Sequence, residues 1–501
     1  MTSNSLLQKT LIDSFRKHAE RPAIWCENES INYRELHERV SVLAAHIMKT
    51  CPRDARIGIA SQRDFASIIG ILAVIVSGRA YVPLNPAYPV DRLRSIVEIA
   101  GIDLVLATPE TAQRIVDTGV SLSILVSDGC NWRDAHGLAI PGEPFALEPV
   151  SVDNAAYFMF TSGTTGVPKG VRVDFGNLEA YLQNISAIAD ISANDKCSHF
   201  FELSFDLSVH DLFVTFSCGA ELVVLPKKAT LDIVDFVNER GITCWFSVPS
   251  LASYCDRVGG LKPGALNHLR LALFCGEALP VTLARKFATA SPNAAIFNIY
   301  GPTEATIAFT FFEYTDGLQL EDLTIVPIGQ PFGDLRVDYL PFEGGLELAL
   351  GGAQVTPGYI NNDEEQAAKF YVKEGTRWYR TGDAVDRDEK LGTLFLGRID
   401  DQVKVNGYRV ELAEIDACLR SAAGSPEAAS LVWAGSDGSG PAEIIGFVVG
   451  SDLSSGAIRK AARKLLPNYM VPRKVISLDR MPTNSSGKID RKALKAMLRA
   501  D

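Results

Sequence analysis

The sequence predicts an α/β protein: a large N-terminal domain of two β-sheets covered by helices plus a small β-barrel, followed by a small α+β domain. Short β-branched runs alternate with helical patterns over most of the chain, which is typical of parallel sheets covered on both faces. Past about residue 330, short alternating strands with glycine turns indicate an antiparallel section or small barrel. A helix–strand–strand–helix pattern follows, over roughly a hundred residues, an ordinary size for a small domain.

The first segment, 1–20, has the pattern of an amphipathic helix and lacks the apolar centre of a signal peptide. The most apolar run, 68–77, is about half the length of a membrane span, so it predicts a buried helix that leads into a turn. Further strands are predicted at 56–60, 103–107, 123–127, 221–225, 244–248 and 295–299, and helices at 177–189 and 232–241.

The later segments predict strands at 344–352 and 392–398, and a boundary near 397–410. Beyond it come a helix at 411–424, strands at 430–435 and 443–450, a helix at 455–466 and a basic tail. We therefore expect an N-terminal core at 1–399 and a C-terminal lid domain at 400–501.

The composition limits the kinds of partner. The chain of 501 residues is 47% hydrophobic and 22% charged, as in ordinary globular proteins. Its net charge of −11 argues against nonspecific binding to nucleic acid or an anionic membrane. The nine cysteines are scattered with no C-x-x-C pair, which indicates neither a disulfide framework nor a zinc site. We expect a cytoplasmic protein with reduced thiols.

A glycine-rich loop, SGTTGVPKG at 162–170, lies between two strand-like runs. Its glycine N–H groups, its hydroxyls and the charge of Lys169 suit phosphate, although a plain hairpin turn is the alternative. The Walker spacing and the dinucleotide-binding spacing are both absent, so a P-loop kinase is excluded.

Further motifs carry candidate ligands, each with a structural alternative. In NIYGPTEATIA (298–308), Tyr300 could stack on a base and Glu304 could hold Mg²⁺; alternatively, Thr303 caps a helix. Asp383 could bind the ribose hydroxyls and Arg398 could reach ribose or phosphate, although turn chemistry and surface ion pairing are the more usual explanation for charged loop residues. Lys488 lies in a Ser-Ser-Gly loop before the basic helix, in surroundings like those of Lys169.

Together, TSGTTGVPKG, NIYGPTE, YRTGD, GRIDDQVKVNGYRVE and NSSGKIDRK resemble the core motifs of the adenylate-forming superfamily. The resemblance is to amino-acid adenylation domains of nonribosomal peptide synthesis and their free-standing relatives, and it extends to the segments 31–36, 78–92 and 346–359. Two residues depart from the usual pattern: Asn85 replaces an aspartate, and Phe175 stands where histidine is common. Neither is expected to take part in the chemistry.

The resemblance implies ATP and Mg²⁺ as cofactors, and a two-step reaction through an acyl-adenylate to a phosphopantetheine thioester. Catalytic roles are implied for Lys488, which would bridge the substrate carboxylate and the α-phosphate, for Thr303 at that phosphate, and for Glu304 at the metal. The ATP-binding residues would be Thr161, Ser162, Gly163, Thr164, Thr165, Lys169, Tyr300, Asp383 and Arg398. The C-terminal domain would turn about a hinge at Asp400, presenting either Lys488 or the region of Gly407, the thiolation residue.

The segment SFDLSVHDLF (204–213) predicts the substrate class. By resemblance, Asp206 would bind a substrate ammonium; its alternative role is to cap the next helix, and the two are compatible. The pocket would be lined by Leu207, His210, Phe246, Leu273, Cys275, Ile299, Ile307 and Ala308. This apolar set favours a small apolar amino acid, alanine of either hand ahead of proline. His210 either contacts a polar substrate group or is a satisfied wall residue.

The stretches FDLSV and LFCGEALP are similar to those of D-alanine–carrier-protein ligases. Because the sequence ends soon after the last motif, we expect the acceptor to be a separate carrier protein with a phosphopantetheine arm, and less so coenzyme A. Two alternatives stay open: an acyl- or aryl-CoA ligase of the same fold, and a non-catalytic regulator that binds nucleotide or carrier protein. Asp206 argues against the first, and the retained lysines argue against the second.

Overall fold

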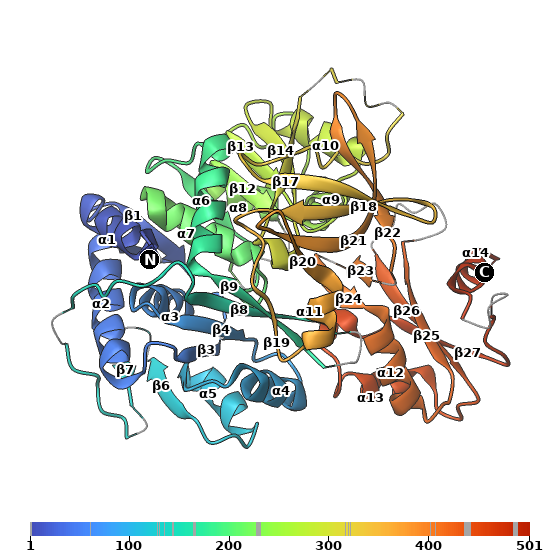
Figure 1. Cartoon of the computed structure of the whole chain (residues 1–501), viewed down its shortest axis with the longest axis horizontal. Helices are drawn as coiled ribbons and strands as arrows, with labels where there is room; N and C mark the ends of the chain where they lie inside the picture. Colours follow the sequence, from blue (N-terminus) through green and yellow to red (C-terminus); the bar gives the residue numbers. More distant parts are fainter. Residues whose placement is uncertain are drawn as a thin grey trace.

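The computed structural model describes residues 3–60, 62–127, 129, 131–134, 136–142, 145–163, 167–226, 232–315, 317–318, 320, 322–400, 402–405, 407–434, 442–483 and 489–500. Two large sheets, a smaller antiparallel sheet and a C-terminal α+β domain make up the molecule (Figure 1). Among the described residues, no helix is both long enough and apolar enough to cross a membrane.

The first sheet has nine strands, mostly parallel in its centre. In order they are β16 (Gln330–Pro331), β15 (Thr310–Tyr314), β14 (Ala295–Tyr300), β13 (Leu271–Phe274), β12 (Cys244–Ser247), β10 (Lys196–His199), β11 (Glu221–Val224), β1 (Pro22–Cys26) and β2 (Glu29–Asn32). The carboxyl ends of β10, β12, β13 and β14 lead into the segments that carry most of the predicted substrate residues, as expected for parallel sheets.

The second sheet has eight strands and carries the glycine-rich loop. In order they are β19 (Gly358–Ile360), β9 (Lys169–Asp174), β8 (Ala155–Thr161), β4 (Ala80–Leu84), β3 (Arg56–Ala60), β5 (Leu104–Ala107), β6 (Ser123–Ser127) and β7 (Trp132–Arg133). β8 and β9 pair antiparallel, with Thr161 opposite Lys169, so the loop joins strand to strand as predicted. Lys169 is already the first residue of β9.

Helices surround and separate the two sheets. They are α1 (Leu7–Lys17), α2 (Tyr33–Thr50), α3 (Phe65–Val76), α4 (Val90–Ala100), α5 (Pro109–Val116), α6 (Phe175–Ala189), α7 (Leu207–Cys218), α8 (Ile233–Arg240), α9 (Pro249–Arg257), α10 (Val281–Ala290) and α11 (Asp363–Lys369). α3 is the predicted apolar helix and is buried from Ala66 to Val76. One core cluster joins α1, α3, α6 and α7 to strands of both sheets, so the two sheets share a hydrophobic core.

The predicted barrel section is a five-stranded antiparallel sheet. Its strands are β17 (Arg336–Phe342), β18 (Gly345–Gly351), β21 (Thr376–Asp388), β20 (Phe370–Lys373) and β22 (Gly392–Arg398). β21 and β22 bring Asp383 directly opposite Arg398, two residues that the sequence assigned to ribose binding.

The C-terminal α+β domain begins with a hairpin, β23 (Gln402–Val405) and β24 (Tyr408–Glu411). The elements that follow are α12 (Leu412–Ala423), β25 (Ala428–Trp433), β26 (Glu443–Val449), α13 (Ser455–Ala462), β27 (Lys474–Leu478) and α14 (Arg491–Ala500). α12 and α13 cover one face of the β25–β26–β27 sheet, and α14 covers the other. The α/β class with a small C-terminal α+β domain is therefore confirmed, whereas the exact boundary at 399 and 400 stays a prediction.

Candidate active site

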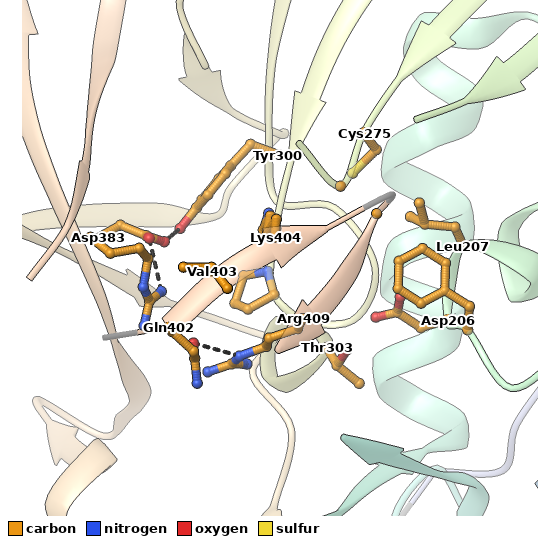
Figure 2. Close-up of a pocket in the computed structure, with 16 residues that line it drawn as sticks. Asp206, Leu207, Cys275, Tyr300, Thr303, Asp383, Gln402, Val403, Lys404 and Arg409 are labelled. Atoms are coloured by element: carbon orange, nitrogen blue, oxygen red, sulfur yellow. Dashed lines mark hydrogen bonds and ion pairs between the residues drawn. The ribbon is translucent and has the colours of Figure 1, made fainter. Parts of the chain in front are cut away.

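A small cavity of about 60 Å³ lies where the first sheet, the antiparallel sheet and the β23–β24 hairpin meet. Among its lining residues are eight that the sequence singled out: Asp206, Leu207, Cys275, Tyr300, Thr303, Asp383, Arg398 and Gly407. Figure 2 shows Val403 and Lys404 on the strand between Tyr300 and Asp383 on one side and Asp206 on the other. The hairpin of the C-terminal domain therefore forms one wall of the cavity.

Tyr300, Asp383 and Arg398 form a buried polar cluster at one end of the cavity. The Tyr300 hydroxyl donates to one oxygen of Asp383, and Arg398 Nη1 donates to the other at 2.8 Å. Arg398 also binds Asp400 through Nε at 2.8 Å and Nη2 at 2.6 Å. The predicted ribose residues are thus brought together and are linked directly to the predicted hinge.

Asp206 lies at the other end, just before α7, and is 6% exposed. The sequence offered a second role for this residue, as the N-cap of this helix. Asp206 does occupy the N-cap position, but it has helical φ and ψ and its side chain makes no capping hydrogen bond. Its pKa is raised to about 6, mainly by burial and also by the nearby Glu304, although a hydrogen bond with Thr303 and the charges of Lys404 and Arg409 act in the opposite direction. The carboxylate is left available to a cation in the cavity.

Three of the predicted pocket residues, His210, Phe246 and Leu273, line a separate void of only about 10 Å³. The Tyr181 hydroxyl lies 2.6 Å from His210 Nδ1, and the imidazole packs on Phe246 at 4.4 Å between ring centroids. Burial lowers the His210 pKa to about 3, so the ring is neutral at physiological pH. This paired and buried imidazole favours the reading of His210 as a satisfied wall residue over that of a contact to a polar substrate group.

The remaining predicted pocket residues differ in position. Ile299 lines a larger neighbouring cavity, whereas Ile307 and Ala308 are fully buried. Thr306 and Ile307 have positive φ angles of 59° and 72°, a strained conformation for β-branched residues. Gln354 holds this turn by donating to the Ala308 carbonyl at 2.7 Å. The strained turn places the Ile307 carbonyl 4.0 Å from Cys275 Sγ, at the cavity wall.

The phosphate-loop residues lie close to the C-terminal domain. Ser162 Oγ donates to the Arg409 carbonyl at 2.8 Å and accepts from the Glu411 amide at 3.2 Å. Lys169 Nζ contacts Glu365 at 2.6 Å and Glu411 at 3.6 Å, and its side chain is 4% exposed. Gly163 leaves no room for a Cβ, which would lie 2.0 Å from the Val167 carbonyl oxygen. Thr164 and Thr165 lie outside the described residues, and Thr161 ends β8.

Glu304, the predicted magnesium ligand, lies in a short 3₁₀ turn, Thr303–Ala305, and is fully buried. Its two oxygens accept from Arg409 Nη1 at 2.9 and 2.8 Å, and Tyr359 donates to one of them at 2.6 Å. Burial alone would raise the Glu304 pKa, but Arg409, Tyr359 and Lys169 outweigh it and lower the pKa to about 2. The carboxylate is therefore ionised and fully paired.

A larger cavity of about 770 Å³ adjoins the small one and shares Gly276, Tyr300, Arg398, Val403 and Lys404 with it. It reaches residues of α9, α10 and the C-terminal domain. The Gly407 amide donates to Glu277 Oε1 at 2.7 Å, and both residues line this region, Gly407 in the small cavity and Glu277 in the large one. Gly407, the predicted thiolation residue, thus lies in the small cavity and is hydrogen-bonded to a residue that lines the larger one.

Lys488 lies outside the described residues. Its described neighbours Thr483 and Ile489 form a β-bridge, and α14 follows on the sheet face opposite α12. Figure 1 places α14 at the outer edge of the C-terminal domain, whereas β23 and β24 lie toward the large sheets.

Arg409, Glu411, Lys404 and Tyr359 are the functional-site residues that the sequence analysis missed. The first three belong to the motif GRIDDQVKVNGYRVE, which was recognised, but no feature of the motif shows which residues the strands direct inward. The alternation of β23 and β24 decides this, because successive side chains of a strand point to opposite faces.

Comparison with known proteins identifies the class. A family model described as AMP-binding enzyme matches residues 11–360, well over half of the sequence, and the chain belongs to this family.

Malpinin synthetase of Mortierella alpina is 35% identical, over 96% of this chain and 6% of the length of the synthetase. The antimetabolite synthetase AmbB of Pseudomonas aeruginosa is 34% identical, over 96% of this chain and 38% of the length of AmbB. The chain therefore spans a minor part of these relatives. The Vibrio cholerae adenylation domain AlmE, solved with glycyl-adenosine-5'-phosphate, superimposes with a TM-score of 0.90 at 27% identity, covering 100% of this chain and 99% of AlmE.

Proposed function

We propose that the protein activates a small amino acid with ATP as its aminoacyl-adenylate and transfers it to the phosphopantetheine thiol of a carrier protein. The observation that carries this proposal is the placement of Asp206. Its buried carboxylate makes no capping bond and faces the same small cavity as Tyr300, Thr303 and Asp383. A buried anion beside a nucleotide site suits a substrate that is itself a cation at that end.

In the first step, a substrate carboxylate oxygen attacks the α-phosphorus of ATP, and the bond to pyrophosphate breaks. Asp383 would accept hydrogen bonds from the ribose hydroxyls, since Arg398 and Tyr300 hold its carboxylate in place. Lys169 and the glycine-rich loop would take the leaving pyrophosphate. Lys488 would bridge the two reacting groups while charge builds on phosphorus. This division of roles is the one that the family resemblance implies.

The side chains fit a magnesium ion that is held mainly by nucleotide. Among the described residues, no cluster of three or more His, Cys, Asp or Glu side chains could hold a metal. Glu304 offers one ionised carboxylate, which suits Mg²⁺ because this ion is usually bound through one or two carboxylates plus phosphate oxygens. When bound, Mg²⁺ would neutralise the phosphate charge.

In the second step, a thiolate attacks the acyl carbonyl of the adenylate, and AMP leaves. The orientation of the C-terminal domain supports this step, because Gly407 lies beside the large cavity through which an arm could approach. A structure of PA1221, described as a nonribosomal peptide synthetase protein with adenylation and carrier domains, matches at 25% identity and a TM-score of 0.82. It favours a carrier protein over coenzyme A as acceptor.

The apolar side chains beside Asp206 support a small apolar substrate. Leu207 and Cys275 line the cavity with Asp206, and among the described residues the lining holds no lysine or arginine of the N-terminal core other than Arg398. Alanine of either hand and proline were the candidates from the sequence, and the glycyl-adenylate bound to AlmE adds glycine.

The test is amino-acid-dependent release of pyrophosphate from ATP, measured with glycine, both alanines, proline and the other proteinogenic amino acids. Acetate, propionate and benzoate serve as controls without an amino group. We expect turnover with one or two small amino acids and none with the controls. Turnover with the controls alone would instead identify an acyl- or aryl-CoA ligase, and no turnover with any acid would favour a non-catalytic regulator.

A further inference from the structure

A further polar cavity, of about 390 Å³, lies at the carboxyl ends of three parallel strands of the second sheet. Its walls come from the segments that follow β3, β4 and β5, and from residues 202–203, which follow β10 of the first sheet. Among its described lining residues, none belongs to the C-terminal domain and none lines the cavities of the candidate active site. It is therefore a separate cavity of the N-terminal core.

The order of the strands explains why a cavity forms at this edge of the sheet. β3 pairs with β4 on one side and with β5 on the other, and all three are parallel. The chain passes from β3 through α3 to β4, and then from β4 through α4 back across β3 to β5. α3 and α4 pack into different core clusters, on opposite faces of the sheet. Parallel sheets bind ligands at such a reversal of strand order.

Four charged side chains line this cavity: Arg63, Glu110, Arg114 and Glu202. Among the described residues, none of the four forms an ion pair. Arg63 Nη1 donates to the Phe200 carbonyl at 2.8 Å, and Arg114 donates to two backbone carbonyls at 3.0 and 2.7 Å. Burial lowers the pKa of Arg63, although the charge of Glu202 acts in the opposite direction. The two guanidinium groups are thus held in place without a paired carboxylate, which suits the binding of an anion.

Asn85 helps to leave the arginines unpaired. It is one of the two departures from the family pattern, which has an aspartate at this position. Asn85 Nδ2 donates to Glu202 Oε2 at 2.6 Å, and Asn85 Oδ1 accepts from the Ala87 amide at 2.9 Å. An aspartate would instead place a second carboxylate against Glu202. With asparagine, the lining carries two positive and two negative side chains, which complements a ligand that carries both signs.

We propose that this cavity binds a small zwitterion, a free α-amino acid, at a site separate from that of activation. The ligand carboxylate would lie on Arg63 and Arg114, since guanidinium groups suit carboxylates in charge and shape. The ligand ammonium would lie on Glu202. The hydrogen bonds of that carboxylate are to neutral groups, those of Asn85 and Tyr408. The volume is within the usual range for a small-molecule site. The inference goes beyond the proposed function and does not depend on it.

The test is hydrogen–deuterium exchange of the full-length protein, without ATP, in a titration with glycine, the amino acid whose side chain cannot exclude it. Peptides that cover 83–90 and 108–117 report on the cavity, and a peptide that covers β25 and β26 reports any general effect of the solute. We expect glycine to slow exchange of the first two peptides only, by about tenfold at ten times its Kd. Acetate, which lacks the ammonium, and methylammonium, which lacks the carboxylate, should have a much smaller effect.

Variants of the full-length protein assign the effect to residues. R63Q should abolish the protection by glycine, and E202Q should make glycine no better than acetate, so the second variant tests the site even if the first does not fold. R336Q, which changes an exposed arginine of β17, is the matched control and should behave as wild type. D206N should keep the protection, whereas a signal transmitted from the activation site along residues 202–206 would be lost in it.

Absence of protection by glycine up to about 100 mM, a range that covers millimolar Kd values, would overturn the inference. Equal protection by acetate or by inorganic phosphate would overturn it as well, because the cavity would then bind any small anion. Loss of the protection in D206N would assign the effect to the activation site instead. Since ATP is absent and no turnover is measured, each of these results is independent of whether the chain activates an amino acid.

Discussion

The ionisation of one buried carboxylate, that of Asp206, is expected to set the pH dependence of amino-acid activation. Burial raises its pKa to about 6, and the form that can pair with an ammonium is the ionised one. In the free protein, the ionised fraction of the Asp206 carboxyl increases as the pH rises through about 6. We therefore predict that kcat/KM for the amino acid rises from pH 5 to pH 7 and then levels off, measured by pyrophosphate release.

Asp206→Asn provides the control for this profile. The amide cannot ionise and leaves the substrate ammonium without an anion, a loss of roughly 3 kcal/mol or about a hundredfold in kcat/KM. Its remaining activity should lose the rise centred near pH 6. Wild-type activity in the variant would place the ammonium site elsewhere.

Lys488 is predicted from its motif to act on the reacting atoms. Lys488→Ala should lower amino-acid-dependent pyrophosphate release by about a hundredfold or more, because a contact that strengthens in the transition state affects kcat rather than binding. The Kd for ATP, measured by calorimetry, should stay close to that of the wild type. Lys492→Ala, in the exposed part of α14, is the matched control. Near-normal turnover of K488A would refute the assignment.

At the scale of elements, the β23–β24 hairpin depends on one glycine in its turn. Gly407 has a φ of 82°, and a Cβ there would lie 2.5 Å from Val248 Cγ1. Gly407→Ala should slow transfer of the aminoacyl group from preformed adenylate to a thiol by about tenfold or more, because the turn cannot seat against α9. Pyrophosphate release in the first step should change much less.

Gly424→Ala separates the clash from backbone strain. Gly424 also has a positive φ, 59°, but no atom lies within 4 Å of a Cβ built there. This variant should lose stability by about 1 kcal/mol without a selective loss of thiol transfer. Equal effects of both substitutions on transfer would show that strain alone explains the loss.

At the scale of the whole molecule, one ion pair joins α4 to α12 across the domain interface. Arg92 and Glu414 are 7% and 5% exposed, and among the described residues Arg92 Nε has no partner. Burial raises the pKa of Glu414, which Arg92 partly offsets. The pair therefore joins the two domains without satisfying all its polar atoms.

Arg92→Met should therefore favour the undocked domain, since it leaves the Glu414 charge buried alone, at a cost of roughly 3–5 kcal/mol. Tryptic cleavage near Arg398 and Lys404 should speed up. The double variant R92M/E414M buries no unpaired charge and should return toward the wild-type cleavage rate. A single variant that resists trypsin as well as the wild type would show that this pair does not set the orientation.

The sequence determined the elements and the class of the protein by itself. Local patterns decide these features: β-branched runs predicted β3 and β6 with their observed bounds, and all but the last residue of the apolar run at 68–77 lies in the buried α3. The ordered motifs gave the family, because their residues are contiguous in the chain. The motifs alone assigned Asp383 and Arg398 to the same ribose site, and the β21–β22 register places the two residues opposite each other.

Only the tertiary structure decided which charges meet. Asp206 occupies the N-cap position of α7, but its side chain makes no capping hydrogen bond, because a local helix signal does not fix the direction of a side chain. Arg409 reaches Glu304 across 105 residues of sequence, and Glu411 approaches Lys169 across an even longer span. Such contacts depend on how two domains dock, and docking is set by shape and charge over the whole interface, which no local stretch of sequence encodes.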